Sequence, residues 1–206
     1  MPNINCSSIL FNKPFNTNYD FTVSFTYTMS AGSTTPVQNN GFSVFFINGN
    51  QSTLVGGGSG QGLGIISNTN TTSTSAVSGV FAALGFDVLG TYSKNANPFS
   101  SGNVSTIPYN IGLRTTSDFT FINSIIPTDS TLFYPYNTVN TIRISVRNQF
   151  RTITISKLYN SVYKTVATFD STSIPNLGKL PQTGKFGIGF SGDTLFNVQD
   201  INLNYS

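Results

Sequence analysis

The sequence contains no histidine and no tryptophan, and its seven acidic residues are all aspartates because glutamate is missing too. General acid–base catalysis relies mostly on histidine or on a carboxylate with a tuned pKa. Retaining glycosidases need two carboxylates about 5 Å apart, whereas the aspartates here are never nearer than seven positions in the sequence. We therefore expect a protein that binds without catalysis, and not an enzyme.

Charge is also scarce. Charged residues make up only 8% of the 206 residues, whereas soluble domains typically carry roughly 25%. Asn, Ser and Thr are abundant instead, together with 18 Phe and 9 Tyr. A disordered chain has high net charge and little to bury, so this composition predicts a folded chain with a neutral surface of hydroxyl and amide groups. The net charge of +3 is spread along the chain without a basic run, which argues against nucleic acid as a partner.

Long apolar runs are missing as well. No stretch of about 18 apolar residues is present, so we expect no membrane insertion. The first residues, Met1 to Asn5, lack the basic and apolar regions of a secretory signal. We expect an extracellular protein or one on a virion surface, exported after signal removal or by another route such as lysis. Cys6, the single cysteine, allows no internal disulfide and is predicted to be a small buried residue.

Alternation of apolar and polar residues is the main pattern in the sequence. It runs through residues 21–28 and 142–147, and it resumes at 153–156 after Asn148 and Gln149. Period-2 alternation is typical of strands with one buried face. Residues 142–147 and 153–156, with the short connection between them, predict a hairpin. Residues 186–190 and 196–205 predict two more strands, and the alternation slips at Gln199 and Asp200, which predicts a β-bulge there.

Two segments, 42–47 and 80–89, are more continuously apolar, as expected of central strands buried on both faces. Loops rich in Ser, Thr, Asn and Gly separate the strands at 30–41, 48–62, 67–79 and 90–108. No long helical period, internal repeat or change of composition interrupts this pattern. The sequence predicts an all-β sandwich that forms a single domain over residues 1–206.

Four segments in fixed order resemble the legume-lectin (L-type lectin) family. Residues 40–46 (NGFSVFF) resemble its D-G-x-A-F-F strand, and residues 56–65 (GGGSGQGLGI) resemble its glycine-rich loop. Residues 83–88 (ALGFDV) with 111–113 (IGL) resemble its A-V-E-F-D-T and I-G-I-D strands, and residues 185–192 (KFGIGFSG) with 200–203 (DINL) resemble its closing segments. The resemblance implies a concanavalin A-like jelly-roll β-sandwich of two antiparallel sheets, with loops that hold a sugar.

The resemblance also implies which residues hold the sugar. An Asp of the first motif, a backbone N–H of the glycine loop and a calcium-held Asn bind it in the family. These positions correspond here to the carbohydrate-binding set Asn40, Gly58, Gly60 and Asn95, with Asp87 organising the site. A stacking platform is expected among the aromatic residues Tyr92, Phe99, Tyr109, Phe133, Tyr134 and Tyr136, although most aromatic residues of a sandwich belong to its core.

The chain departs from the family at the metal ligands. Gly85 stands where the family has Glu, Asn110 stands where it has His, and the Asp of the next strand falls at Leu113 or Arg114. Only Asp87 survives of the acidic set, and calcium affinity rises with the number of charged ligands. We expect the double metal site to be lost and no cofactor to be needed, the more so if Arg114 points toward the site.

Two alternatives remain for Asp87. It is either a ligand of a single calcium ion, together with Asn95, Asn97 and other oxygens of residues 92–97, or a buried carboxylate that accepts hydrogen bonds from a loop backbone.

The leading functional prediction is a non-catalytic carbohydrate-binding module with glycans as partners. The alternative is the same sandwich used as a structural or decoration protein on a virion or other large assembly. Its partners would be copies of itself or capsid proteins, and this role is compatible with attachment to host glycans without requiring it.

Overall fold

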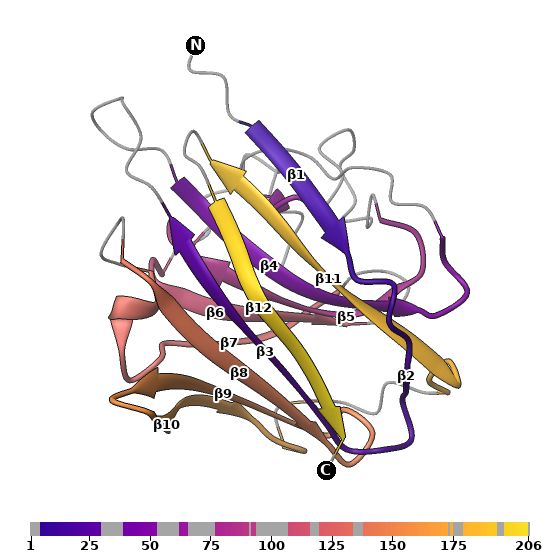
Figure 1. The fold of residues 1–206 in the computed structure, drawn as a ribbon. Coiled ribbons are helices and arrows are strands. Elements are labelled where there is room, and N and C mark those ends of the chain that lie inside the picture. The colour runs from indigo at the N-terminus through magenta and orange to yellow at the C-terminus, as the bar shows by residue number, and fades with distance from the viewer. Residues whose placement is uncertain are drawn as a thin grey trace.

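The computed structural model describes residues 5–29, 39–52, 62–65, 77–90, 92–93, 107–115, 120–133, 138–172, 174, 179–192 and 196–205. These residues form two antiparallel sheets that stack face to face, as Figure 1 shows. The predicted β-sandwich of two antiparallel sheets is therefore confirmed. Among the described residues, no helix is long and apolar enough to cross a membrane.

The larger sheet has seven strands in the order β1-β11-β4-β5-β6-β7, with β2 beside β11. Its strands are β1 (Asn5–Leu10), β2 (Phe15–Asn16), β4 (Asn39–Asn48), β5 (Val80–Asp87), β6 (Asn110–Thr115), β7 (Thr120–Ile125) and β11 (Thr183–Gly192). Strand β11 comes late in the chain but lies between β1 and β4. The sheet therefore joins segments from both ends of the sequence.

The smaller sheet has five strands in the order β10-β9-β8-β3-β12. Its strands are β3 (Phe21–Met29), β8 (Asn140–Arg147), β9 (Thr152–Tyr159), β10 (Val162–Phe169) and β12 (Phe196–Tyr205). A 3-10 turn, η2 (Ser130–Leu132), lies between β7 and β8. The predicted hairpin is β8–β9, and the predicted bulge appears as a register shift between Gln199 and Asn202, where Asp200 has φ +52°.

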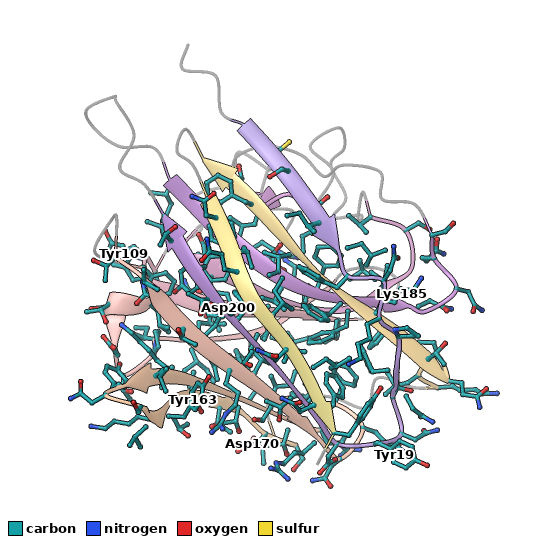
Figure 2. The ribbon with its side chains drawn as sticks, viewed as in Figure 1. Tyr19, Tyr109, Tyr163, Asp170, Lys185 and Asp200 are labelled. Atoms are coloured by element: carbon teal, nitrogen blue, oxygen red, sulfur yellow. The ribbon has the colours of Figure 1, made fainter. Side chains whose placement is uncertain are left out.

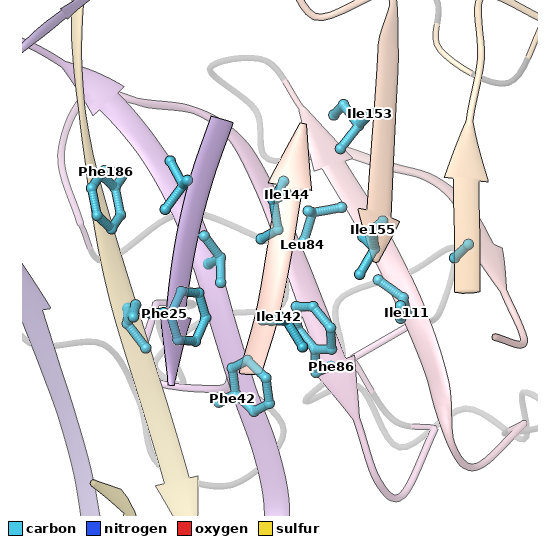
Figure 3. Packing of buried hydrophobic residues seen from close by; sticks show 14 of the residues in the cluster. Phe25, Phe42, Leu84, Phe86, Ile111, Ile142, Ile144, Ile153, Ile155 and Phe186 are labelled. Atoms are coloured by element: carbon cyan, nitrogen blue, oxygen red, sulfur yellow. The ribbon is translucent and has the colours of Figure 1, made fainter. Parts of the chain in front are cut away.

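The main core lies between the sheets and is rich in phenylalanine. Alternate residues of β3 (Phe21, Val23, Phe25, Tyr27) face alternate residues of β4 and β5. The rings of Phe42 and Phe86 stack with centroids 4.3 Å apart, and Figure 3 shows both beside Ile142 of the opposite sheet. Burying one such side chain stabilises the fold by about 1.5–3 kcal/mol, so this layer holds the sheets together.

A second, smaller apolar cluster covers the other face of the seven-stranded sheet. It consists of Phe45, Ile47, Leu63, Ile65, Val77, Val80, Ala83 and Tyr92. The strand residues among them alternate with those of the main core, so β4 and β5 are buried on both faces. This confirms the prediction made from the continuously apolar segments 42–47 and 80–89.

A row of small residues crosses the middle of this covered face. The register aligns Ser8, Gly189, Ser43, Gly85, Gly112 and Ser124 on five neighbouring pairs of strands. Their small size lets the covering segments approach the sheet closely. The Ser43 hydroxyl, for example, donates to the Leu63 carbonyl at 2.9 Å.

Cys6 was predicted to be buried, and that prediction was wrong. It lies in β1 at the edge of the seven-stranded sheet, and its side chain is exposed. An edge strand has a neighbour on one side only, so a small residue there gains little burial.

Candidate functional site

Two of the predicted site residues, Asn40 and Asp87, belong to neighbouring strands at one end of the seven-stranded sheet. Gly41 of β4 pairs with Asp87, the last residue of β5, and Asp87 pairs with Asn110, the first residue of β6. The backbone of Asn40 belongs to β4, and its side chain lies outside the description. Gly58, Gly60, Asn95 and Asn97 lie outside the described residues, so their roles stay predictions.

Asp87 fixes the turn that follows β5. Its carboxylate is fully buried, and it accepts the backbone N–H of Gly90 at 2.8 Å and that of Ser93 at 3.1 Å. One accepting oxygen is Oδ1 and the other is Oδ2. Of the two roles predicted for Asp87, the structure therefore shows the contacts of the second, a buried carboxylate that holds a loop backbone. Its role as a calcium ligand stays a prediction.

Asn110 fixes the other end of the same loop. The Ser93 hydroxyl donates to its Oδ1, and its Nδ2 donates to the Ile107 carbonyl. The backbone N–H of Tyr109 also reaches the Val88 carbonyl at 3.3 Å. Both ends of the segment from 88 to 109 are thus tied to each other and to the last and first residues of β5 and β6.

Arg114 lies on the same face of the sheet, four residues beyond Asn110 along β6. Because paired residues of an antiparallel ladder share a face, Asn110, Gly112 and Arg114 all project toward the side of Asp87. The side chain of Arg114 is 1% exposed, and its Nη2 donates to the Tyr92 carbonyl at 2.8 Å. The guanidinium carbon also lies 5.1 Å from the centroid of the Tyr92 ring. Burial lowers the pKa of Arg114, and attraction from Tyr92 and Asp87 acts against that change.

Gly85 and Gly112 explain how Tyr92 reaches this position. A Cβ on Gly85 would lie 2.3 Å from two atoms of the Tyr92 ring, and a Cβ on Gly112 would lie 2.4 Å from the Ser93 hydroxyl oxygen. Only glycine leaves room for residues 92 and 93 to lie directly on the sheet. The resemblance placed Gly85 where the family has a metal-binding Glu, and in the structure the ring of Tyr92 lies against this position.

The predicted aromatic platform is only partly described. Tyr92 and Phe133 are buried, so neither can stack on a sugar. The prediction that they are candidates for the stacking platform was therefore wrong. Tyr109 is half-buried, its ring centroid lies 5.9 Å from that of Phe133, and Figure 2 labels it at the loop end of the sandwich. Phe99, Tyr134 and Tyr136 lie outside the described residues.

A polar cluster centred on Asp129 was not predicted from the sequence. This residue caps η2 by accepting the Thr131 N–H at 2.8 Å, and it also accepts the Tyr159 hydroxyl. The Nζ of Lys157 lies 3.4 Å from its Oδ2. Burial raises the pKa of Asp129, but the hydrogen bonds from Thr131 and the attraction of Lys157 outweigh it, so the net pKa is lower than usual. The Asp-Ser-Thr sequence is a capping signal that could have revealed this contact.

Comparisons with known proteins support the fold. No family model matches the sequence, and no curated protein matches it. Among solved structures, the lectin UEA-II complexed with galactose is 17% identical with a TM-score of 0.62, and the match covers 100% of this chain and 84% of that one. Lectin I from Ulex europaeus, in complex with the methyl glycoside of α-L-fucose, is 19% identical, with a TM-score of 0.58 and coverage of 94% and 77%.

The metal-free form of lectin I-B4 from Griffonia simplicifolia is 16% identical, with a TM-score of 0.58 and coverage of 95% and 81%. Neighbours of this kind over nearly the whole chain show that it has the legume-lectin fold in a divergent form. The jelly-roll prediction is thereby confirmed, and so is the resemblance on which it rested.

Proposed function

We propose that this chain is a non-catalytic carbohydrate-binding module whose site lies at the ends of β4, β5 and β6. The observation that supports it best is the loop from 88 to 109, which Asp87, Asn110 and Arg114 tie to the sheet at both ends. A binding loop with fixed ends loses less conformational entropy when a ligand binds. This loop contains Asn95 and Asn97, whose amides can both donate and accept hydrogen bonds.

The chemistry suits a neutral polyhydroxylated ligand. In this proposal Asn40 and Asn95 bind sugar hydroxyls through their side-chain amides, and Gly58 and Gly60 let backbone N–H groups come close. Asp87 contributes indirectly because its carboxylate holds the loop backbone. The structural neighbours bound to galactose and to a fucoside make glycans the ligand class to test first. Glycan binding suits an extracellular location.

The structural alternative, a decoration protein on a virion or other assembly, has no support among the three solved structures named above, which are lectins. It predicts a different result in the same assay, because an assembly protein needs no affinity for free glycans.

Glycan-array binding of the purified chain tests the proposal. The wild-type protein should bind a defined set of glycans, and Asn40→Ala and Asn95→Ala should each weaken that binding at least about tenfold, as expected when a buried polar contact to ligand is lost. Asn204→Ala is the matched control, because Asn204 is an exposed residue of β12 in the other sheet. An array with no binding by the wild-type protein, in calcium and in chelator, would contradict the proposal and favour the assembly role.

A further inference from the structure

The legume-lectin fold implies a pair of divalent cations beside the strand that ends in Asp87. The described residues do not fit such a pair. Among them no three His, Cys, Asp or Glu side chains gather in one place. Both oxygens of the Asp87 carboxylate already accept backbone N–H groups. At Gly85, the position of the family Glu, the space is filled by the ring of Tyr92.

A positively charged side chain is nevertheless present on this face of the sheet. The guanidinium of Arg114 is buried on the face from which Asp87 projects, and it binds the backbone carbonyl of Tyr92 at 2.8 Å. A carbonyl oxygen of this loop is the kind of ligand that calcium would take. Here it accepts from a guanidinium, which is always charged and offers several donors in a fixed plane.

Asp87 and Arg114 hold the same turn through side chains of opposite charge. Asp87 binds N–H groups of Gly90 and Ser93, while Arg114 binds the carbonyl of Tyr92 between them. The ring of Tyr92 lies against Gly85 and within 5.1 Å of the guanidinium carbon, so the side chain and the backbone of one residue are fixed together. The chain therefore supplies a carboxylate that accepts from the N–H groups of the turn and a guanidinium that donates to its carbonyl group.

We propose that Arg114 is a built-in cation that takes over the structural task of the divalent metals, so that the loop after β5 is held in place without any bound ion. Arg114 is thus a positioning residue: it acts on the loop, not on a ligand. This inference goes beyond carbohydrate binding and does not depend on it, because it concerns how the loop is held and its test contains no sugar.

Trypsin cleavage after Lys94, which directly follows the held turn in the sequence, measures how often the turn opens. When opening is fast relative to cleavage, the cleavage rate follows the population of the open form. Arg114→Met keeps a long apolar stem but removes the charge, and loss of a charge-assisted hydrogen bond should raise the rate about tenfold or more. Arg114→Lys keeps the charge without the planar fork and should give an intermediate rate. Arg151→Met, at an exposed residue of the β8–β9 turn, is the matched control and should match the wild type.

The wild-type protein supplies the second measurement. Its cleavage rate and its Tm should be the same in chelator, in calcium and in manganese. Chelation that speeds cleavage or lowers the Tm would show that a bound metal holds the loop and would overturn the proposal, even if the Arg114 variants failed to fold. An Arg114→Met protein that folds, as judged by its far-ultraviolet circular dichroism, and is cleaved at the wild-type rate would overturn it as well.

Discussion

The contact between Gly85 and Tyr92 allows a strong test of how the covering loop sits on the sheet. In Gly85→Ala the new Cβ would lie 2.3 Å from Cδ1 and Cε1 of the Tyr92 ring, far inside van der Waals contact. The ring cannot simply turn aside, because Tyr92 is fully buried and also lies close to Gly112. Over-packing of this kind costs about 1–3 kcal/mol.

Displacement of Tyr92 would also move its backbone carbonyl away from the guanidinium of Arg114. That hydrogen bond is 2.8 Å long and involves a charged donor, and such bonds contribute about 1.5–3 kcal/mol. We expect Gly85→Ala to lower the free energy of unfolding by about 3 kcal/mol. For a chain of this length each kcal/mol shifts the Tm by about 2–4 °C, so the Tm should fall by about 6–12 °C.

Thermal and urea unfolding followed by circular dichroism measures this change, and a double-mutant cycle identifies its cause. Tyr92→Ala removes the ring, so Gly85→Ala should cost almost nothing in that background. Alanine is even favoured over glycine within a strand by roughly 0.5–1 kcal/mol. An equal penalty for Gly85→Ala in both backgrounds would refute the reasoning, because the cost would then not arise from the Tyr92 ring.

Two further predictions concern the cluster at Asp129 and the main core. The pKa of Asp129 is lowered in the folded state, so its stabilisation is present above its unfolded pKa of about 3.9 and is lost as the pH falls through the folded value. Thermal unfolding at about pH 6 and about pH 3 should therefore show a smaller acid-induced loss of Tm for Asp129→Asn than for the wild type; an equal loss would contradict this. Phe42→Ala should cost about 3–5 kcal/mol in urea unfolding because it leaves a cavity beside Phe86, whereas Tyr19→Ala, at an exposed residue, should cost little.

Much of the fold could be predicted from the sequence. Alternation in residues 21–28 and 142–147 places one face of each strand in the core, and that is how β3 and β8 lie. The continuously apolar segment 42–47 correctly predicted a strand covered on both sides. Strands β1, β7 and β10 were not predicted individually, because edge and near-edge strands such as these carry polar residues on both faces and lack a clear period.

The candidate site was harder to predict. The sequence suggested Asp87 as its centre, and the structure gives that residue a defined task. The contact between Arg114 and Tyr92 could not be predicted, because it depends on the register between β5 and β6 across a long loop. The sequence left open whether Leu113 or Arg114 faces the site. The register answers this by pairing Asp87 with Asn110, which turns Arg114 toward the loop and Leu113 into the core.

The position of β11 has a consequence for how the protein is made. Strand β11 lies between β1 and β4, so the seven-stranded sheet stays divided until residues 183–192 have left the ribosome. Until then β1 and β4 each present an unpaired edge, which is a template for aggregation. Pairing between such distant segments is also slow because the chain must close a large loop first. We therefore expect folding to begin in the β8–β9–β10 hairpins, and the seven-stranded sheet to close only after β11 has been made.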